Sequence, residues 1–368
     1  MNGFILTFDN LIYKLYYIKI NILFKREKKK VVMKIKNNIS YIIAEIGINH
    51  EGNFNLAKKS IKSASLSGAN AVKLQLFNPK TLAQKKSAKT NDQKKRTAKK
   101  ETLFQMLKRM TLSLNQLKKL KKYAKSLSLD FICSVFDEES FYLSKKIGLD
   151  AYKIASSDLT DLKLINQIKK INKPIILSTG MGSYKEIKNA VKILKGKKVY
   201  LLHCVSLYPC PVNLINLQRI KSLSKKFKLP TGYSDHSLGV NACLMAIMMG
   251  SKIIEKHFTL NKTWIGADHE LSADPEDMKI ICSFSKNYKK LCGKGAIEPS
   301  NKEKKMRRFF RKSLFAKKSI QIGEKITVEK IEARRPGIYF KSENLQKIIN
   351  KKIKQNILKD QPFTKKHI

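Results

Sequence analysis

Acidic residues are scarce in this sequence, and histidines are few. Its 368 residues include 28 Asp and Glu against 76 Lys and Arg, for a formal net charge of +48, and only six histidines. A charge of this size would ordinarily indicate a nucleic-acid or anionic-surface partner. The basic residues are spread along the whole chain, however, and form no stripe with interleaved aromatic residues. We therefore interpret the charge mainly as solvated surface and expect no nucleic-acid partner.

Long apolar runs and closely spaced cysteine pairs are also absent. Lys14, Lys19 and Lys25 interrupt the apolar stretches of residues 1–32 well before the ~20 residues that a membrane span requires, and no small-residue cleavage site follows them. None of the six cysteines has C-x-x-C spacing, and a free thiol in an apolar run behaves as a small hydrophobic group. These absences predict a cytoplasmic protein with no membrane association. Because Met33 begins a more ordinary start, residues 1–32 are interpreted as an N-terminal extension of unknown role.

From residue 41 the sequence alternates short β-rich runs with helical stretches, which is typical of βα units around a parallel sheet. The β-rich runs lie at 41–46, 71–76, 130–134, 151–155, 174–178, 198–204, 229–233 and 252–258. The helical patterns lie at 55–67, 114–126, 138–147, 164–171, 183–194, 216–227 and 240–249. Repeated units of this kind within about 250 residues predict a (β/α)₈ TIM barrel better than an open sheet.

The chain is long enough for a large domain and a smaller one. We assign residues 33–297 to the barrel, in which the lysine-rich connection 77–110 is long enough to be a lid over the barrel mouth. The charged stretch 298–311 is interpreted as a linker. Residues 312–368 have the short strands and turns of a small β-rich domain. A domain of this size buries little apolar surface by itself, so we expect it to dock on another surface.

Polar side chains occur at the carboxyl end of every predicted strand, which is the end where TIM barrels carry their function. In chain order they are Glu45, Lys73, Gln75, Ser134, Lys153, Ser156, Ser178, Ser206, Tyr208, Ser234, Asp235, His236, Glu255 and His257. The sequence therefore predicts one polar site at the mouth of the barrel.

His236 and His257 suggest a metal at this site, since neutral imidazole is a common ligand for Mn, Zn or Fe. Two hydrogen-bonded core histidines are the structural alternative, but the polar residues at the other strand ends favour the metal. Asp235, directly before His236, is expected to orient a ligand or cap a helix.

Lys73 and Lys153 lie in otherwise apolar strands, where a buried ammonium is costly unless an anion meets it. Together with the hydroxyls of Ser156 and Ser178 they favour an anionic substrate, although either lysine alone could extend its amine to solvent. The apolar neighbours of Glu45 suit a raised pKa and proton transfer. The alternative to proton transfer is a structural role, in which one of the two lysines neutralises Glu45.

Six motifs resemble those of the N-acetylneuraminate (sialic acid) synthase family. They are IAEIGINHEG at 43–52, YKIAS at 152–156, ILSTGM at 176–181, LHCVSLYP at 202–209, GYSDH at 232–236 and IEKHF at 254–258. The resemblance runs from about residue 40 to the end of the chain, and the closing part, with Arg335-Pro336-Gly337, resembles the antifreeze-like (SAF) domain of these enzymes.

The resemblance implies condensation of phosphoenolpyruvate with the open-chain aldehyde of an N-acylated hexosamine and water, which gives a nine-carbon 2-keto acid and phosphate. His236 and His257 would hold a divalent metal that polarises the aldehyde oxygen. Mn²⁺ is the expected ion, with Mg²⁺ or Co²⁺ as alternatives. Glu45 would be the acid or base that handles the attacking water. In the implied domain-swapped homodimer, the small domain of one chain covers the barrel mouth of the other, and Arg335 reaches the N-acyl group of the partner's substrate.

The resemblance also implies substrate contacts. Those to phosphoenolpyruvate are Lys73, Ser134, Lys153, Ser156, Ser178 and Ser234, and those to the sugar are Gln75, Tyr208 and Asp268. The sequence departs from the family after the fourth strand, where Ser156-Ser157-Asp158 replaces Ser-Gly-Glu or Ser-Gly-Asp. Asp158 is kept as a second catalytic candidate, although the side chain of Ser157 could crowd the phosphate.

Three alternatives stay open. Synthases of legionaminic and pseudaminic acid and spore-coat polysaccharide relatives share these motifs, although Gly266-Ala267-Asp268-His269 resembles the neuraminate and legionaminate pattern more than the pseudaminate one. N-acetylmannosamine and a 2,4-diacetamido-6-deoxymannose relative are therefore both candidate substrates. The barrel could also have kept its fold and lost its activity, and a basic nucleic-acid-binding protein, whose binding weakens steeply with salt, is the alternative from another class.

Overall fold

The computed structural model describes residues 33, 35, 39–97 and 100–368. The chain forms two compact units, Met1–Leu291 and Cys292–Ile368. The predicted N-terminal extension, 1–32, lies outside the described residues. Each unit is treated by itself below.

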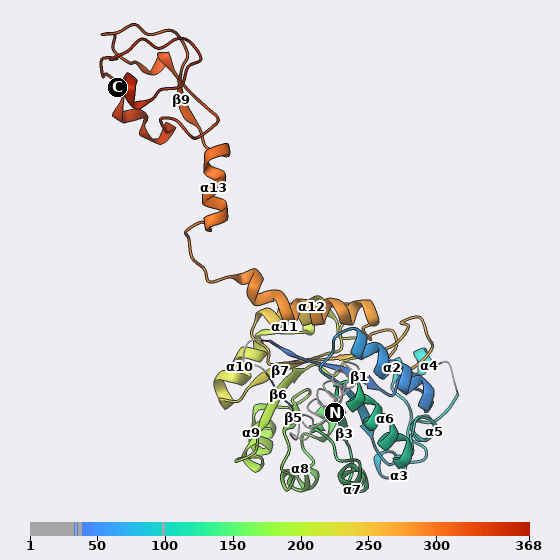
Figure 1. Ribbon diagram of the computed structural model, residues 1–368. Coiled ribbons are helices and arrows are strands. Elements are labelled where there is room, and N and C mark those ends of the chain that lie inside the picture. Colours follow the sequence, from blue (N-terminus) through green and yellow to red (C-terminus); the bar gives the residue numbers. More distant parts are fainter. Residues whose placement is uncertain (1–32, 34, 36–38, 98–99) are drawn as a thin grey trace, which may run out of the picture. The chain divides into compact units, whose positions relative to one another are not determined.

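The first unit is a barrel of parallel strands that pair in chain order and close between β1 and β8, with helices around it (Figure 1). The strands are β1 Tyr41–Gly47, β2 Ala71–Leu76, β3 Asp130–Val135, β4 Ala151–Ile154, β5 Ile175–Ser178, β6 Val199–Cys204, β7 Thr231–Asp235 and β8 Ile253–His257. The predicted TIM barrel is confirmed.

Helices connect the strands and cover the outside of the barrel. They are α2 Phe54–Leu66, α6 Leu114–Ser126, α7 Glu138–Ile147, α8 Leu162–Lys169, α9 Tyr184–Ile193, α10 Gln218–Phe227, α11 Asn241–Met248 and α12 Pro275–Cys292. The ends of the helices have local causes in the sequence, as α7 shows. Asp137 caps its start by accepting a hydrogen bond from the Ser140 backbone N–H, and Gly148 closes its end with φ at +74°, a conformation that glycine adopts without steric cost.

Alternate residues along each strand belong to two different apolar layers. In β1, Ile42, Ala44 and Ile46 pack outward against the helices, whereas Tyr41 and Ile43 fill the inside of the barrel. This alternation follows from the period of two of a β-strand. It also brings the next inward position of β1, Glu45, above the inner apolar layer.

The long connection after β2 is mostly helical. It contains α3 Pro79–Leu82, α4 Asn91–Thr97 and α5 Leu103–Arg109. Met106 and Leu107 of α5 and the following Met110 pack with Ile48 and Phe77 in a small apolar cluster of their own. The segment that the sequence suggested as a lid is thus anchored by buried side chains at its second half.

The second unit contains a helix and a small β structure. Helix α13, Asn301–Phe310, lies inside the segment predicted to be a linker, and β9 Ser313–Ala316 pairs antiparallel with β10 Ile331–Arg334. The 3₁₀ helices are η3 Val328–Lys330, η4 Ser342–Lys347 and η5 Lys365–His367. A separate core, which includes Ile320, Ile326 and Phe363, holds this unit together.

No helix in the described part of the chain is both long and apolar enough to cross a membrane. All six cysteines lie among the described residues and are free thiols, and all but Cys292 are buried.

Candidate active site

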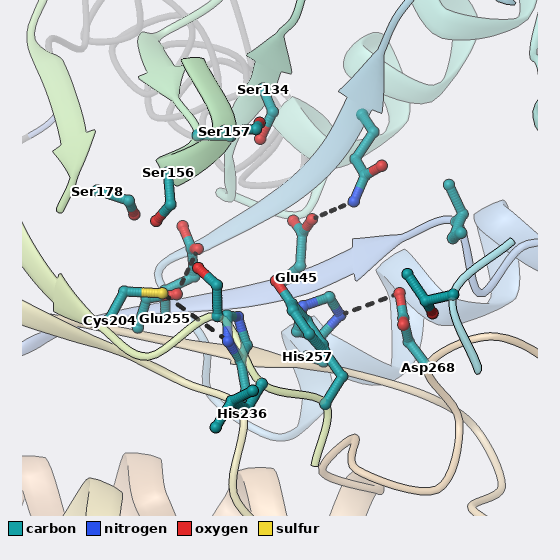
Figure 2. Close-up of a pocket in the computed structure, with 18 of the residues that line it drawn as sticks. Glu45, Ser134, Ser156, Ser157, Ser178, Cys204, His236, Glu255, His257 and Asp268 are labelled. Atoms are coloured by element: carbon teal, nitrogen blue, oxygen red, sulfur yellow. Dashed lines mark hydrogen bonds and ion pairs between the residues drawn. The ribbon is translucent and has the colours of Figure 1, made fainter. Parts of the chain in front are cut away.

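A cavity of about 540 Å³ opens at the carboxyl ends of the barrel strands. Figure 2 shows Glu45, Glu255, His236 and His257 directed into this space. Every barrel strand or the loop after it contributes polar lining. The lining includes Glu45, Lys73, Gln75, Ser134, Lys153, Ser156, Ser178, Ser206, Tyr208, Ser234, His236, Glu255, His257 and Asp268.

Strand periodicity explains why these particular residues meet. Lys73 and Gln75 of β2 lie two positions apart and therefore on the same face of the strand, as do Glu255 and His257 of β8. The intervening Lys256 points the other way, toward the helix layer, where it pairs with Asp235. A polar layer at the inward positions thus stands directly above the apolar inner layer.

Four buried charges of alternating sign dominate the electrostatics of the cavity. Lys73 Nζ lies 2.9 Å from Glu45 Oε2 and 3.8 Å from Glu255 Oε2. Lys153 Nζ donates to Glu255 Oε1 over 3.2 Å. We call Glu45, Lys73, Lys153 and Glu255 the charge quartet. The quartet is neutral when all four are ionised, which is how four charges can be buried together.

The two glutamates of the quartet titrate differently. Burial raises the pKa of Glu45 to about 6, because the nearby charge of Lys73 offsets burial only in part. Burial also opposes ionisation of Glu255, but Lys153 and Lys73 outweigh it and lower its pKa to about 2. Two carboxyl groups whose environments separate their pKa values are suited to different tasks. Glu45 can exchange a proton near neutral pH, whereas Glu255 stays ionised.

Hydroxyl groups surround the two lysines of the quartet. Lys73 Nζ donates to Ser134 Oγ over 2.9 Å, and Ser156 Oγ accepts from the Gly180 backbone N–H over 3.0 Å. Ser178 Oγ is buried and has no hydrogen-bond partner among the residues that the structure describes, which is costly unless a ligand supplies one. Two ammonium groups and free hydroxyl donors form a site for a phosphate or carboxylate group.

The histidine pair stands beside the quartet. The ring centroids of His236 and His257 are 5.4 Å apart, and Tyr208 stacks on His236 at 4.1 Å. His236 Nδ1 lies 2.7 Å from the Val205 carbonyl oxygen, which orients the ring and leaves Nε2 as the free nitrogen. His257 Nδ1 is buried 3.7 Å from Asp268 Oδ2 and makes no hydrogen bond to any described residue. Burial and the charge of neighbouring cations lower the pKa of His257 well below its usual range.

These features fit a divalent metal bound by two imidazoles. A neutral ring with an unpaired buried nitrogen is a ready ligand, and the His236 ring is fixed by its backbone partner. Among the residues that the structure describes, no three His, Cys, Asp or Glu side chains gather closely enough to hold a metal. Water or substrate oxygens would therefore complete the coordination around the two histidines.

A second buried ion pair lies behind the histidines, on the outer face of the same strands. Lys256 Nζ, next in sequence to His257, lies 2.8 Å from Oδ2 of Asp235, next in sequence to His236. Asp235 Oδ1 also accepts hydrogen bonds from the hydroxyls of Tyr233 and Ser237 and from the Ser237 backbone N–H. Asp235 is thus fully engaged away from the cavity, where it ties the ends of β7 and β8 together.

Comparison with known proteins gives the family. The NeuB family matches residues 60–297, and the SAF domain matches residues 311–368. The chain belongs to the NeuB family. It is 39% identical over 325 residues to an N,N'-diacetyllegionaminic acid synthase of Campylobacter jejuni, covering 87% of this chain and 97% of that protein.

Two further relatives agree with this assignment. An N,N'-diacetyllegionaminic acid synthase of Legionella pneumophila is 34% identical over 324 residues, covering 86% of this NeuB-family chain and 91% of that protein. The crystal structure of an N-acetylneuraminic acid synthetase from Leptospira borgpetersenii has a TM-score of 0.64 at 34% identity and covers 73% of this chain and 90% of that one. The expected resemblance is confirmed, and the protein is a carbon–carbon bond-forming synthase of the sialic-acid type.

One predicted site residue of the first unit, Asp158, does not line the cavity of this NeuB-family protein. Asp158 is in the 3₁₀ helix η1, Ser156–Asp158, and it is Ser156 and Ser157 that line the cavity instead. Burial raises the pKa of Asp158 to about 7, and its catalytic role stays a prediction. Arg335 belongs to the second unit, where its Nε donates to the Phe310 carbonyl oxygen.

Sequence reasoning missed several cavity residues. Glu255 was noted at a strand end but given no role, although its spacing of two from His257 indicates that both face inward. Cys204 at the end of β6 also lines the cavity, as do residues of the connection after β2. The latter are Thr90, Asp92, Gln93, Arg96, Met106 and Leu107. No pattern in that lysine-rich connection marks which of its residues turn inward.

The Asp235–Lys256 pair gives a stability prediction. Both side chains have 0% exposure, so Lys256→Met should leave a buried unpaired carboxylate and lower the free energy of unfolding by about 3 to 5 kcal/mol, as measured by urea denaturation. Lys262→Met is the matched control. Its side chain is 41% exposed and pairs with Asp274 and Asp277, so the loss should stay below about 1 kcal/mol. Equal losses in the two variants would contradict the interpretation.

Proposed function

We propose that this NeuB-family protein condenses phosphoenolpyruvate with the open-chain aldehyde of an N-acylated hexosamine. Carbon 3 of phosphoenolpyruvate bonds to the aldehyde carbon, water adds at carbon 2, and phosphate leaves, which gives a nine-carbon 2-keto sugar acid. The observation that carries the proposal is the convergence, in one cavity, of two buried lysines, a carboxyl group with a raised pKa and a histidine pair.

The lysine side of the cavity suits phosphoenolpyruvate, which carries a phosphate and a carboxylate. Lys73 and Lys153 are each paired with a glutamate of the quartet, and the unpartnered Ser178 hydroxyl adds a donor. An arriving anion shares these donors with Glu45 and Glu255. Its negative charge further disfavours ionisation of Glu45, so that substrate binding favours proton uptake at that carboxyl group.

Glu45 is the residue proposed to move the proton. Oε1 lies 3.5 Å from Gln75 Nε2, and Oε2 is held by Lys73, so the carboxyl group is fixed between the anion side of the cavity and the histidine pair. In its ionised form it takes the proton of the water that adds to carbon 2.

We further propose that His236 and His257 hold a divalent metal. The preferred ion is Mn²⁺, with Mg²⁺ or Co²⁺ as alternatives. When bound, such an ion polarises the aldehyde oxygen as a Lewis acid. The contribution of the protein is positional, because the Val205 carbonyl and the Tyr208 ring fix the His236 ring, and the Asp235–Lys256 pair fixes the strand ends.

For the sugar we propose the 2,4-diacetamido-6-deoxymannose relative over N-acetylmannosamine. Two relatives that cover most of this chain are named as diacetyllegionaminic acid synthases, which supports a substrate with two acylamino groups. Tyr208 and Asp268 line the cavity beside the histidines, on the side where the sugar would lie with its aldehyde oxygen at the metal.

We propose that a second copy of the chain completes the site. Apolar side chains are exposed on the loops that follow β5 to β8, namely Met181, Leu207, Val212, Leu214, Leu238 and Ile265. Exposed apolar side chains also gather in the second unit, at Met306, Phe309, Phe310, Ile338 and Tyr339, close in sequence to Arg335. Exposed apolar surface on both units supports mutual burial in a dimer.

The experiment that tests the reaction measures phosphate release from phosphoenolpyruvate with Mn²⁺ and each of the two sugars. We expect release only when metal and an N-acylhexosamine are both present, and its loss on chelation. If neither sugar supports release with any of the three metals, the proposed function is wrong.

The histidine pair gives a metal-binding prediction. His236→Ala or His257→Ala should abolish both turnover and Mn²⁺ binding, because each removes one of two imidazole ligands; binding is measured by calorimetric titration. His203→Gln is the control, since this buried histidine bonds to the Ile215 carbonyl oxygen outside the cavity lining. Unchanged Mn²⁺ affinity in the two alanine variants would remove the pair from the metal site.

Glu45 gives a prediction about turnover and its pH dependence. Because the ionised form accepts the proton and the pKa of Glu45 without substrate is about 6, kcat/KM for phosphoenolpyruvate should fall as the pH drops through about that value. Glu45→Gln should lower kcat by about 100-fold or more while phosphoenolpyruvate still binds. Glu51→Gln, whose carboxylate pairs with Arg109, should change neither. A Glu45→Gln variant with normal turnover would exclude the proposed role.

A further inference from the structure

Arg96 reaches the cavity from the connection after β2. It lies at the end of α4, and its Nη2 donates to the Tyr208 carbonyl oxygen over 2.8 Å, across 112 positions of sequence. Its Nε lies 3.3 Å from the Asp92 carbonyl oxygen. Two of the three nitrogens of the guanidinium group are thus held by backbone carbonyl oxygens, which fixes the group in the wall of the cavity.

The third nitrogen has no partner. Arg96 Nη1 is buried and makes no hydrogen bond within the described part of the chain. A buried unsatisfied donor costs about 1 to 3 kcal/mol, and more when the group is charged. Such a donor, on a residue that lines the cavity and whose other two nitrogens are held in place, is suited to an acceptor that arrives with the substrate.

The surroundings of Arg96 indicate which acceptor that is. Asp268 lines the same cavity, and the positive charge of Arg96 acts on it, but no ion pair within 4.0 Å joins the two. Asp92 lines the cavity as well. The Asp268 carboxylate, on which the charge of Arg96 acts, repels a phosphate, and Asp92 adds a second negative charge to the cavity lining, so a neutral carbonyl oxygen fits this position better than a phosphorylated sugar.

The remaining lining favours an acylamino group over a hydroxyl. An amide has an acceptor and a donor that point in opposite directions, so it can accept from Arg96 while it donates to the Asp268 carboxylate, and both residues line the cavity. A single hydroxyl reaches less far. Met106 and Leu107, which follow Arg96 in the same connection, add apolar lining against which the methyl of an acetyl group can pack.

We propose that Arg96 determines specificity by donating from Nη1 to the carbonyl oxygen of a second acylamino group on the sugar, while Asp268 accepts the N–H of that group. This inference rests on the proposed function. The C2 acylamino group is common to both candidate sugars and is the group expected to meet Arg335 of the partner subunit. The candidates differ at C6, where one is deoxygenated, and at C4, where an acylamino group replaces a hydroxyl; Arg96 therefore reads C4, because only that position offers a carbonyl oxygen in one candidate and none in the other.

The test measures kcat/KM at saturating phosphoenolpyruvate for the 2,4-diacetamido sugar and for N-acetylmannosamine, whose C4 carries a hydroxyl. Arg96→Ala should lower kcat/KM for the diacetamido sugar by about tenfold to a hundredfold, as expected for a hydrogen bond from a charged donor. For N-acetylmannosamine the loss should be much smaller, and the KM for phosphoenolpyruvate should not change. Arg96→Lys keeps the charge without the planar fork and should fall between the unmodified protein and Arg96→Ala.

Lys95→Ala is the matched control, because it removes a positive charge from the exposed side of the same helix and should leave both sugars unaffected. Equal losses for the two sugars in Arg96→Ala, or no loss for either, would overturn the inference and leave the proposed reaction intact. So would an unmodified protein that prefers N-acetylmannosamine. If the unmodified protein turns over neither sugar, the proposed function fails and this inference fails with it.

Discussion

The mutual neutralisation of the four charges in the barrel mouth is the constraint on which the site depends. Glu45, Lys73, Glu255 and Lys153 are all buried, and an isolated buried charge costs several kcal/mol. Each of the four therefore depends on its neighbours for a compensating charge, and Glu45, whose pKa is about 6, is the member that exchanges a proton near neutral pH. The same coupling makes the site responsive, because an anion that competes for the lysines changes the proton affinity of Glu45.

The barrel supplies the rigid frame that this quartet needs. Inward positions are apolar in the amino-terminal half of the strands and polar toward their carboxyl ends, so the four charges lie directly above a packed apolar layer. On the outer face, Asp235 and Lys256 form a second ion pair between the ends of β7 and β8. The residues that bind and the residues that position them thus alternate along the same strands. A substitution at either kind of position acts on the other through the backbone.

Much of the fold and of the site could be predicted from the sequence, and the misses have physical reasons. The strand ends bearing Lys73, Lys153, His236 and His257 could be placed at one mouth because parallel barrel strands all end on the same side. The pairing of Glu255 with both lysines could not be predicted, since it depends on how neighbouring strands are staggered. Arg96 gave no signal at all, because it is one basic residue among many in its connection and only packing turns its side chain inward.

The sequence by itself determined the alternating units, the barrel, the family and the order in which polar residues reach the strand ends, because period and strand direction are local properties of the chain. The tertiary structure decided which of these residues share charge, which donor is left without an acceptor among the described residues, and which residues do not line the cavity, as with Asp158 and Asp235. Distances between side chains far apart in the sequence control these features, since electrostatic and hydrogen-bond energies change steeply over a few ångströms. Such distances are fixed only when the barrel closes.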